Sequence, residues 1–103
     1  MLDDQIRTTT CELRGAVDLD SARDVERQLL CYAEATEWRG DLVVDCAELT
    51  FLDGAGMSAF VRVHLALQEL GRRLVVMNLP ATWRRELEVA GVLDVIGDRD
   101  LGR

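Results

Sequence analysis

The chain has 103 residues, of which 49% are hydrophobic and 30% charged, a composition typical of one folded domain and not of a disordered chain. Its formal net charge of -7 argues against nucleic-acid binding, which needs clustered basic residues. The N-terminus lacks the basic and apolar regions of a secretory signal, and no apolar run approaches the roughly 20 residues that span a bilayer, so we expect a cytoplasmic protein without direct membrane insertion.

The first third of the chain predicts a strand region and then an amphipathic helix. Residues 6–10 are β-prone, and residues 10–14 either continue that strand or form a second one after a tight turn, with Gly15 breaking the run. Ser21, followed by Asp24 three residues later, approximates a capping box at a helix start. The apolar residues that follow recur at helical spacing, which predicts a buried stripe formed by Ala22, Val25, Leu29 and either Tyr32 or Ala33.

Two unbroken apolar runs, residues 42–44 and 74–77, are typical of strands that are buried on both faces of a parallel sheet. Between them we expect a helix from about residue 57 to residue 70. Gly71 suits the position that ends this helix, because glycine readily adopts the left-handed conformation required there. The two strands and the connecting helix therefore predict a parallel crossover unit.

The last quarter of the chain predicts one more helix and a short apolar segment. Pro80 opens the helix near residue 81, where its missing N–H is harmless, and Gly91 ends it. Residues 92–96 then form a strand or coil. The expected buried face of the helix consists of Leu79, Trp83, Leu87 and Ala90.

No catalytic constellation is visible in the sequence. The single histidine, His64, falls on or beside an apolar helical stripe without a partner for acid–base chemistry, which favours a packing role. Residues 53–56 superficially resemble a phosphate loop, but the lysine and spacing of a P-loop are missing. Cys11, Cys31 and Cys46 form no CxxC pair. We therefore expect a binding protein without metal or cofactor, and not an enzyme.

The segment from Asp45 to Phe60 is the most distinctive part of the chain. Gly54 and Gly56 leave the backbone bare before the central helix, so that another protein could approach closely. A tight turn from strand to helix would need the same glycines. The residues alone leave both interpretations open.

Residues 45–57, DCAELTFLDGAGM, are similar to the signature of STAS domains, in particular of bacterial anti-sigma factor antagonists. Residues 13–18, LRGAVD, resemble the end of the family's first strand, and residues 74–78, LVVMN, its strand after the central helix. Residues 83–95, WRRELEVAGVLDV, resemble its C-terminal helix. The resemblance implies one STAS domain over residues 1–103, with an α/β fold, a mixed sheet of four to five strands and about three to four helices.

The resemblance also implies a function. In this family the domain binds an anti-sigma factor with an ATPase-like kinase fold and so frees a sigma factor for transcription, as in a stress response. The anti-sigma factor ends the binding by phosphorylating a serine before the central helix. That serine falls on Ala55 here, and the neighbouring family serine falls on Gly54, so the usual phospho-switch is absent. The implied partner surface comprises Asp18, Asp53, Gly54, Ala55, Gly56, Met57 and Ser58.

Alternatives stay open for both partner and control. The chain could instead be a STAS accessory subunit of an ABC-type lipid transport complex, docked on its ATPase subunit, or a small-ligand sensor that uses the loop groove. Control could come from a displaced acceptor, Ser58 or Thr50. It could also come from a redox switch between Cys11 and Cys46 if their strands are neighbours, although we expect all three cysteines to be small buried hydrophobes.

Overall fold

The computed structural model describes residues 9–35 and 40–99. Along these residues the elements are β1 (Thr9–Val17), α1 (Ala22–Ala35), β2 (Leu42–Leu52), α2 (Gly54–Gln68), β3 (Leu74–Met77), α3 (Ala81–Val89), the 3-10 helix η2 (Val92–Asp94) and β4 (Gly97–Asp98). The strands lie in the order β1-β2-β3-β4, and each neighbouring pair is parallel. The predicted α/β fold with four strands is confirmed, but in the described part of the chain the sheet is parallel and not mixed. Residues 6–8, part of the predicted first strand, lie outside the described residues.

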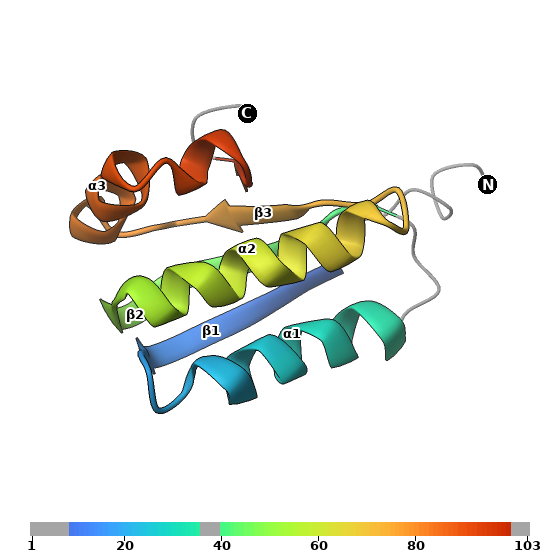
Figure 1. The fold of residues 1–103 in the computed structure, drawn as a ribbon, viewed down its shortest axis with the longest axis horizontal. Helices are drawn as coiled ribbons and strands as arrows, with labels where there is room; N and C mark the ends of the chain where they lie inside the picture. The colour runs from blue at the N-terminus through green and yellow to red at the C-terminus, as the bar shows by residue number, and fades with distance from the viewer. Residues whose placement is uncertain (1–8, 36–39, 100–103) are drawn as a thin grey trace.

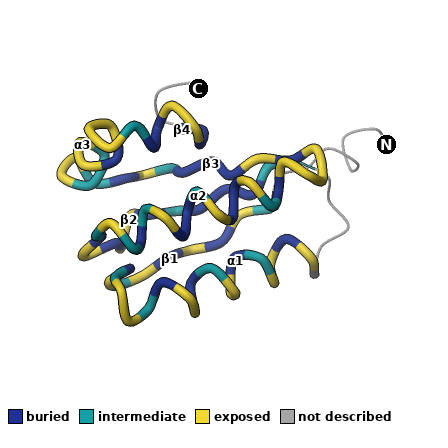
Figure 2. The backbone as a smooth tube through the Cα atoms, in the orientation of Figure 1, coloured by how far each residue is buried: buried dark blue, intermediate teal, exposed yellow. Residues whose placement is uncertain are grey.

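The helices α1 and α2 lie side by side on one face of the sheet, and α3 lies beyond β3 (Figure 1). Their sides toward the sheet are buried and their outer sides exposed (Figure 2). Because the helices connect parallel strands, each runs back along the sheet and begins where the preceding strand ends. The loop after β1 (residues 18–21) and the turn from β2 into α2 (residues 53–56) therefore meet at one edge of the sheet, which we call the loop edge.

The strand β2 is longer than the three residues predicted for it. Its pairing with β1 shifts between Glu12 and Arg14 and again between Gly15 and Ala16, where β2 contributes an extra residue each time. Gly15 was expected to end the strand, but it lies within β1 at the second shift with φ +80°. The two shifts give the second half of β2 a spacing of three between its buried residues, which are Cys46, Leu49 and Leu52.

The helices end at the predicted stop signals, but the buried faces of α1 and α3 differ in part from those predicted. After α2, the Gly71 N–H donates to the Gln68 carbonyl and the Arg72 N–H to the Leu67 carbonyl, with Gly71 at φ +72°, the pattern of a Schellman motif. In α1 the buried stripe includes Ala33, while Tyr32 is exposed. On the predicted face of α3, Leu79 and Leu87 are buried, Trp83 is half-buried and Ala90 is exposed.

His64 confirms the packing role expected for it. Its side chain is 2% exposed, and its Nδ1 accepts a hydrogen bond from the Leu74 N–H at 3.1 Å. The pKa of His64 is lowered, first by burial and then by the positive charge of Arg73, while Asp41 opposes the shift. The neutral imidazole thus joins α2 to the start of β3.

Besides the neutral His64, two charged side chains are buried in the described part of the chain. Arg72, 7% exposed, donates to the Gly40 carbonyl at 2.8 Å and to the Ala33 carbonyl at 3.0 Å, which closes the end of α1. Asp98, 0% exposed, forms an ion pair with Arg84 that joins β4 to α3. Both side chains hold separate elements together.

Candidate functional site

Asp53 joins the two loops at the carboxyl edge of the sheet. It lies between β2 and α2 with extended backbone, φ -115° and ψ -173°, and its Oδ1 accepts from the Gly56 N–H at 3.0 Å. Its Oδ2 accepts from the Leu19 N–H in the loop after β1 at 3.2 Å. One carboxylate thus caps α2 and fixes the neighbouring loop, and α2 begins three residues earlier than predicted.

Asp18 holds the start of α1. Its Oδ1 accepts from the backbone N–H groups of Asp20 at 3.0 Å and Ser21 at 3.1 Å, and the Asp18 N–H donates to Ser21 Oγ at 3.0 Å. This reciprocal arrangement is a capping box, formed by Asp18 and Ser21 and not by the predicted pair Ser21 and Asp24. The carboxylate of Asp18 is therefore engaged within its own loop, and contact with a partner stays a prediction.

The two glycines of the loop differ in their surroundings. A Cβ atom on Gly56 would meet the Val17 carbonyl oxygen at 2.3 Å and Leu52 Cδ1 at 2.7 Å. A Cβ atom on Gly54 would meet nothing within 4 Å. Gly56 therefore permits close packing of α2 on β1 within the chain, while Gly54 leaves bare backbone on the outside.

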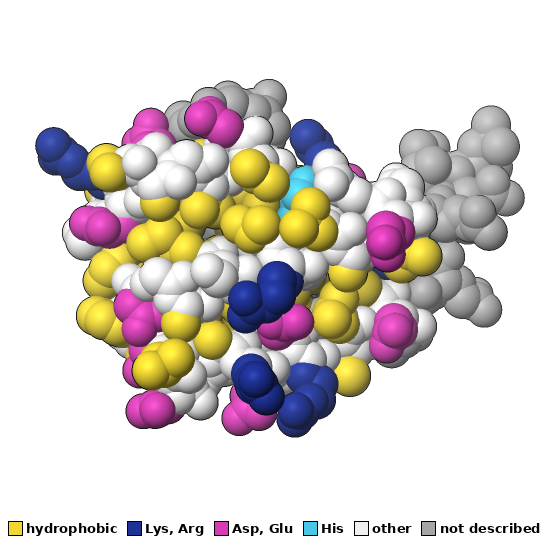
Figure 3. Space-filling model, in the orientation of Figure 1, with side chains coloured by type: hydrophobic (Ala, Val, Ile, Leu, Met, Phe, Trp, Pro, Cys, Tyr) yellow, Lys and Arg dark blue, Asp and Glu magenta, His cyan; other side chains and the backbone are white. Residues whose placement is uncertain are grey.

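Apolar side chains surround this edge. Leu19 is 78% exposed although its backbone is fixed by Asp53, and hydrophobic side chains gather at the end of the molecule where the strands lead into the helices (Figure 3). A groove of about 500 Å³ lies beside the loop, lined by Gly54, Met57, Ser58, Val61, Arg62, Ala90 and Val92. The site thus combines a fixed loop, a projecting leucine and an adjacent groove.

Most of the residues expected from the sequence are brought together here. Asp18, Asp53 and the first turn of α2 share one edge of the sheet, and Ala55 is half-buried while Ser58 and Thr50 are exposed. Sequence reasoning missed Leu19 and the groove wall formed by Ala90 and Val92. The sequence signal for Leu19 was its position as the one apolar residue within the polar segment Asp18–Ser21 before the helix.

The two cysteines considered for a redox switch lie on the adjacent strands β1 and β2. Both are buried thiols, and Cys11 pairs with Val44, two positions before Cys46. Burial raises the pKa of the Cys11 thiol to about 11, which disfavours the reactive thiolate at neutral pH. Cys31 is exposed, contrary to the expectation that all three are buried, and the redox role of the other two stays a prediction.

The described residues contain no group of three or more His, Cys, Asp or Glu side chains that could hold a metal ion. Within the same ranges, no helix has the length and apolar character needed to cross a membrane. The buried His64 points its Nδ1 at the Leu74 backbone and takes no part in the loop edge.

Comparisons with known proteins agree with this architecture. A family model described as "Mlab, STAS domain" matches residues 1–97. The STAS domain of a SulP transporter from Vibrio cholerae superimposes with a TM-score of 0.67 at 17% identity, covering 87% of this chain and 68% of that one. The anti-sigma factor antagonist SpoIIAA in its unphosphorylated form superimposes with a TM-score of 0.61 at 16% identity, covering 85% and 77%. A search among curated proteins gave no match.

Proposed function

The chain belongs to the STAS family, and on that premise we propose that it is an anti-sigma factor antagonist, which binds a kinase-fold anti-sigma factor in the cytoplasm and so frees a sigma factor. The observation that carries the proposal is the loop edge. Asp53 is satisfied by two backbone N–H groups of its own chain, and the fixed loops leave Leu19 and Gly54 facing outward. A rigid, exposed apolar residue beside bare backbone suits protein docking, because little side-chain or loop entropy is lost on binding.

We also propose that the chain acts by binding alone. The polar groups of the loop edge cap helices and tie loops together, and they are not arranged as a nucleophile with a base. The acidic net charge of -7 suits a partner with a basic surface, since complementary charge speeds association.

The phospho-switch of the family is absent in this proposal. Neither Gly54 nor Ala55 has a hydroxyl that could accept a phosphoryl group. In this proposal the loop therefore stays unphosphorylated, and so competent to bind, at these two positions. A phosphate at this place would add about -1.5 to -2 charges to the surface that meets the partner.

A second candidate is the STAS accessory subunit of an ABC-type lipid transport complex. The observation that favours it is the same lack of a hydroxyl at Gly54 and Ala55, because a partner ATPase of a transporter needs no phosphoacceptor. The two candidates share the docking surface and differ in the partner.

The surface is tested with Leu19→Asp as bait in affinity capture from the native host, with Leu65→Asp as the matched control. Leu65 is another exposed leucine, on α2. A kinase-fold anti-sigma factor that wild type and Leu65→Asp retain, and Leu19→Asp loses, supports the proposal. Retention of an ABC-type ATPase subunit in that pattern establishes the second candidate instead. Equal capture by all three baits removes the loop edge as the interface.

The absence of a phospho-switch is tested with the captured anti-sigma factor and labelled ATP. Wild type should take up no label, because the loop offers no hydroxyl, and Ala55→Ser or Gly54→Ser should take it up if the partner is an active kinase. Stoichiometric labelling of wild type would contradict the proposal, and mapping of the label to Ser58 or Thr50 would identify a displaced acceptor.

A further inference from the structure

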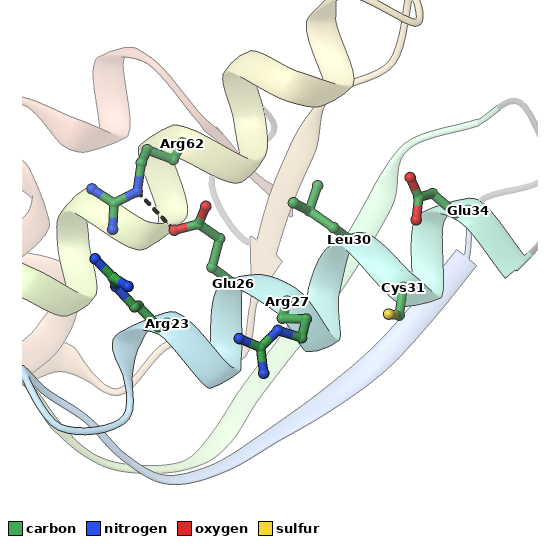
Figure 4. Close-up of a pocket in the computed structure, with 7 residues that line it drawn as sticks. All are labelled: Arg23, Glu26, Arg27, Leu30, Cys31, Glu34 and Arg62. Atoms are coloured by element: carbon green, nitrogen blue, oxygen red, sulfur yellow. Dashed lines mark hydrogen bonds and ion pairs between the residues drawn. The ribbon is translucent and has the colours of Figure 1, made fainter.

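A second groove lies between α1 and α2 on the helical face of the molecule. Its volume is about 690 Å³, and it is lined by Arg23, Glu26, Arg27, Leu30, Cys31 and Glu34 of α1 and by Arg62 of α2. Figure 4 shows Arg23 and Glu26 of α1 and Arg62 of α2 pointing toward one another, while Arg27 and Cys31 extend from the side of α1 away from α2. Arg62 lines both this groove and the groove beside the loop edge.

Arg23 and Arg62 lie at one end of this groove, and of these two only Arg62 is paired with a carboxylate in the described part of the chain. Arg62 Nε donates to Glu26 Oε1 at 2.7 Å, and this bond joins the two helices. Arg23 is directed toward Arg62 (Figure 4), yet Arg23 forms no hydrogen bond or ion pair in the described part of the chain. One positive charge is therefore left uncompensated where the two guanidinium groups approach each other.

The remaining lining residues make the polarity of the groove vary along its length. Arg27 reaches Asp24 only at 3.5 Å, and both side chains are largely exposed, so this pair holds Arg27 weakly. Leu30 is half-buried against the core, and it offers an apolar wall next to the arginines. Glu34 lies at the other end (Figure 4). The groove thus has a cationic end and an apolar middle.

We propose that this groove binds a small phosphorylated molecule, with its phosphate between Arg23 and Arg62 and its body along Leu30. Planar guanidinium groups donate several N–H bonds to one phosphate at once, which suits Arg better than other cations. The volume lies within the roughly 300–1,000 Å³ of small-molecule sites.

The net charge of the chain favours a small anion over an acidic protein or nucleic acid. Its formal net charge is -7, so an extended polyanion meets repulsion over most of the surface. A small phosphate ester meets mainly the local charges, because exposed charges farther than about 8–10 Å are screened at physiological salt. The cationic end of the groove is then the region that decides its binding.

The proposal is tested by NMR titration of the whole chain with inorganic phosphate and with adenosine monophosphate, at matched ionic strength in chloride. Saturable shifts should appear on the groove faces of α1 and α2. Arg23→Gln should weaken binding about tenfold, the loss expected for one charge-assisted contact. Arg85→Gln, an exposed arginine on α3, should bind like wild type.

Removal of the competing carboxylate provides the sharper test. Glu26→Gln should tighten phosphate binding severalfold, because it removes a negative charge beside Arg62; a purely structural role of the pair would predict no gain. Shifts that stay linear and equal in all variants would overturn the proposal. A glutamate peptide that displaces the phosphate at lower concentration would also overturn it and assign the surface to an acidic protein.

Cys31 supplies an independent readout, because its thiol is exposed in the groove while Cys11 and Cys46 are buried. Adenosine monophosphate should slow alkylation of Cys31 by iodoacetamide, a neutral reagent, and in Arg23→Gln the same protection should need about tenfold more nucleotide. Equal rates with and without the nucleotide in wild type would contradict a ligand in this groove. Neither outcome depends on the partner proposed for the loop edge.

Discussion

The loop edge and the interior of this molecule hold their polar side chains in opposite ways. At the loop edge Asp18 and Asp53 stay partly exposed and accept from backbone N–H groups, which leaves Leu19 projecting outward. In the interior of the described ranges, three polar side chains are almost fully buried and each joins two elements; they are His64, Arg72 and Asp98. The interior polar groups therefore join elements of the fold, whereas the carboxylates of the loop edge hold the loops in a form that exposes the side chain of Leu19.

The largest effect on stability is expected from Asp98→Ala. It removes the buried carboxylate that pairs with Arg84, and removal of one partner from a buried pair costs about 3 kcal/mol or more. Urea denaturation monitored by circular dichroism measures the change. Asp24→Ala, which removes an exposed pair with Arg27, should change the free energy of unfolding by less than about 0.5 kcal/mol. Equal losses in the two variants would contradict the contrast between interior and surface.

A smaller but sharper effect is expected from Gly56→Ala. Its Cβ atom would meet the backbone oxygen of Val17 at 2.3 Å, and such overpacking costs roughly 1–3 kcal/mol. Gly54→Ala lies in the same turn of α2 in open space and should be neutral or stabilising by up to about 1 kcal/mol. Thermal melts of the two variants measure this difference, and identical melting temperatures would show that close packing does not require Gly56.

Asp53→Ala should combine a moderate loss of stability with a loss of partner binding. It removes the cap of α2 and the bond to the Leu19 N–H, and the loss of a cap costs about 1 kcal/mol. Asp53→Asn keeps an oxygen acceptor for the Gly56 N–H and should retain most of the stability. Amide hydrogen exchange at Leu19 should accelerate in Asp53→Ala. Unchanged protection there would show that Asp53 does not hold the loop after β1.

The smallest expected effect is a dependence of stability on pH that arises from His64. Its pKa in the folded chain is lowered, chiefly by burial, while in the unfolded chain it is about 6.5. Its contribution is fully present above about pH 6.5 and is lost as the pH falls, because the unfolded chain then binds a proton that the folded chain does not. His64→Gln should flatten the part of the stability profile that lies just below this pH. A profile as steep as that of wild type would assign the acid sensitivity to carboxylates.

Continuous apolar runs and glycine signals were enough to predict much of the fold. The runs at residues 42–44 and 74–77 proved to be neighbouring parallel strands, and Gly71 and Gly91 follow their helices with positive φ. The packing role of His64 also followed from its place on an apolar stripe. These features depend on local spacing and backbone preference, which are readable from neighbouring residues.

The loop edge depended on contacts between residues far apart in the chain. The extension of β2 to Leu52 requires two shifts in register against β1, and a spacing of three matches no regular template. The bond from Leu19 to Asp53 joins residues 34 positions apart. The sequence left open whether Gly56 serves a turn or a partner, and the close approach of Val17 shows a packing reason. By itself the sequence determined the apolar runs at the start of β2 and in β3, the helix stops and the family resemblance, because these follow from local patterns. Only the tertiary structure decided which carboxylates hold loops, which glycine is packed and that Leu19 projects, because each depends on how β1, β2 and α2 meet in space.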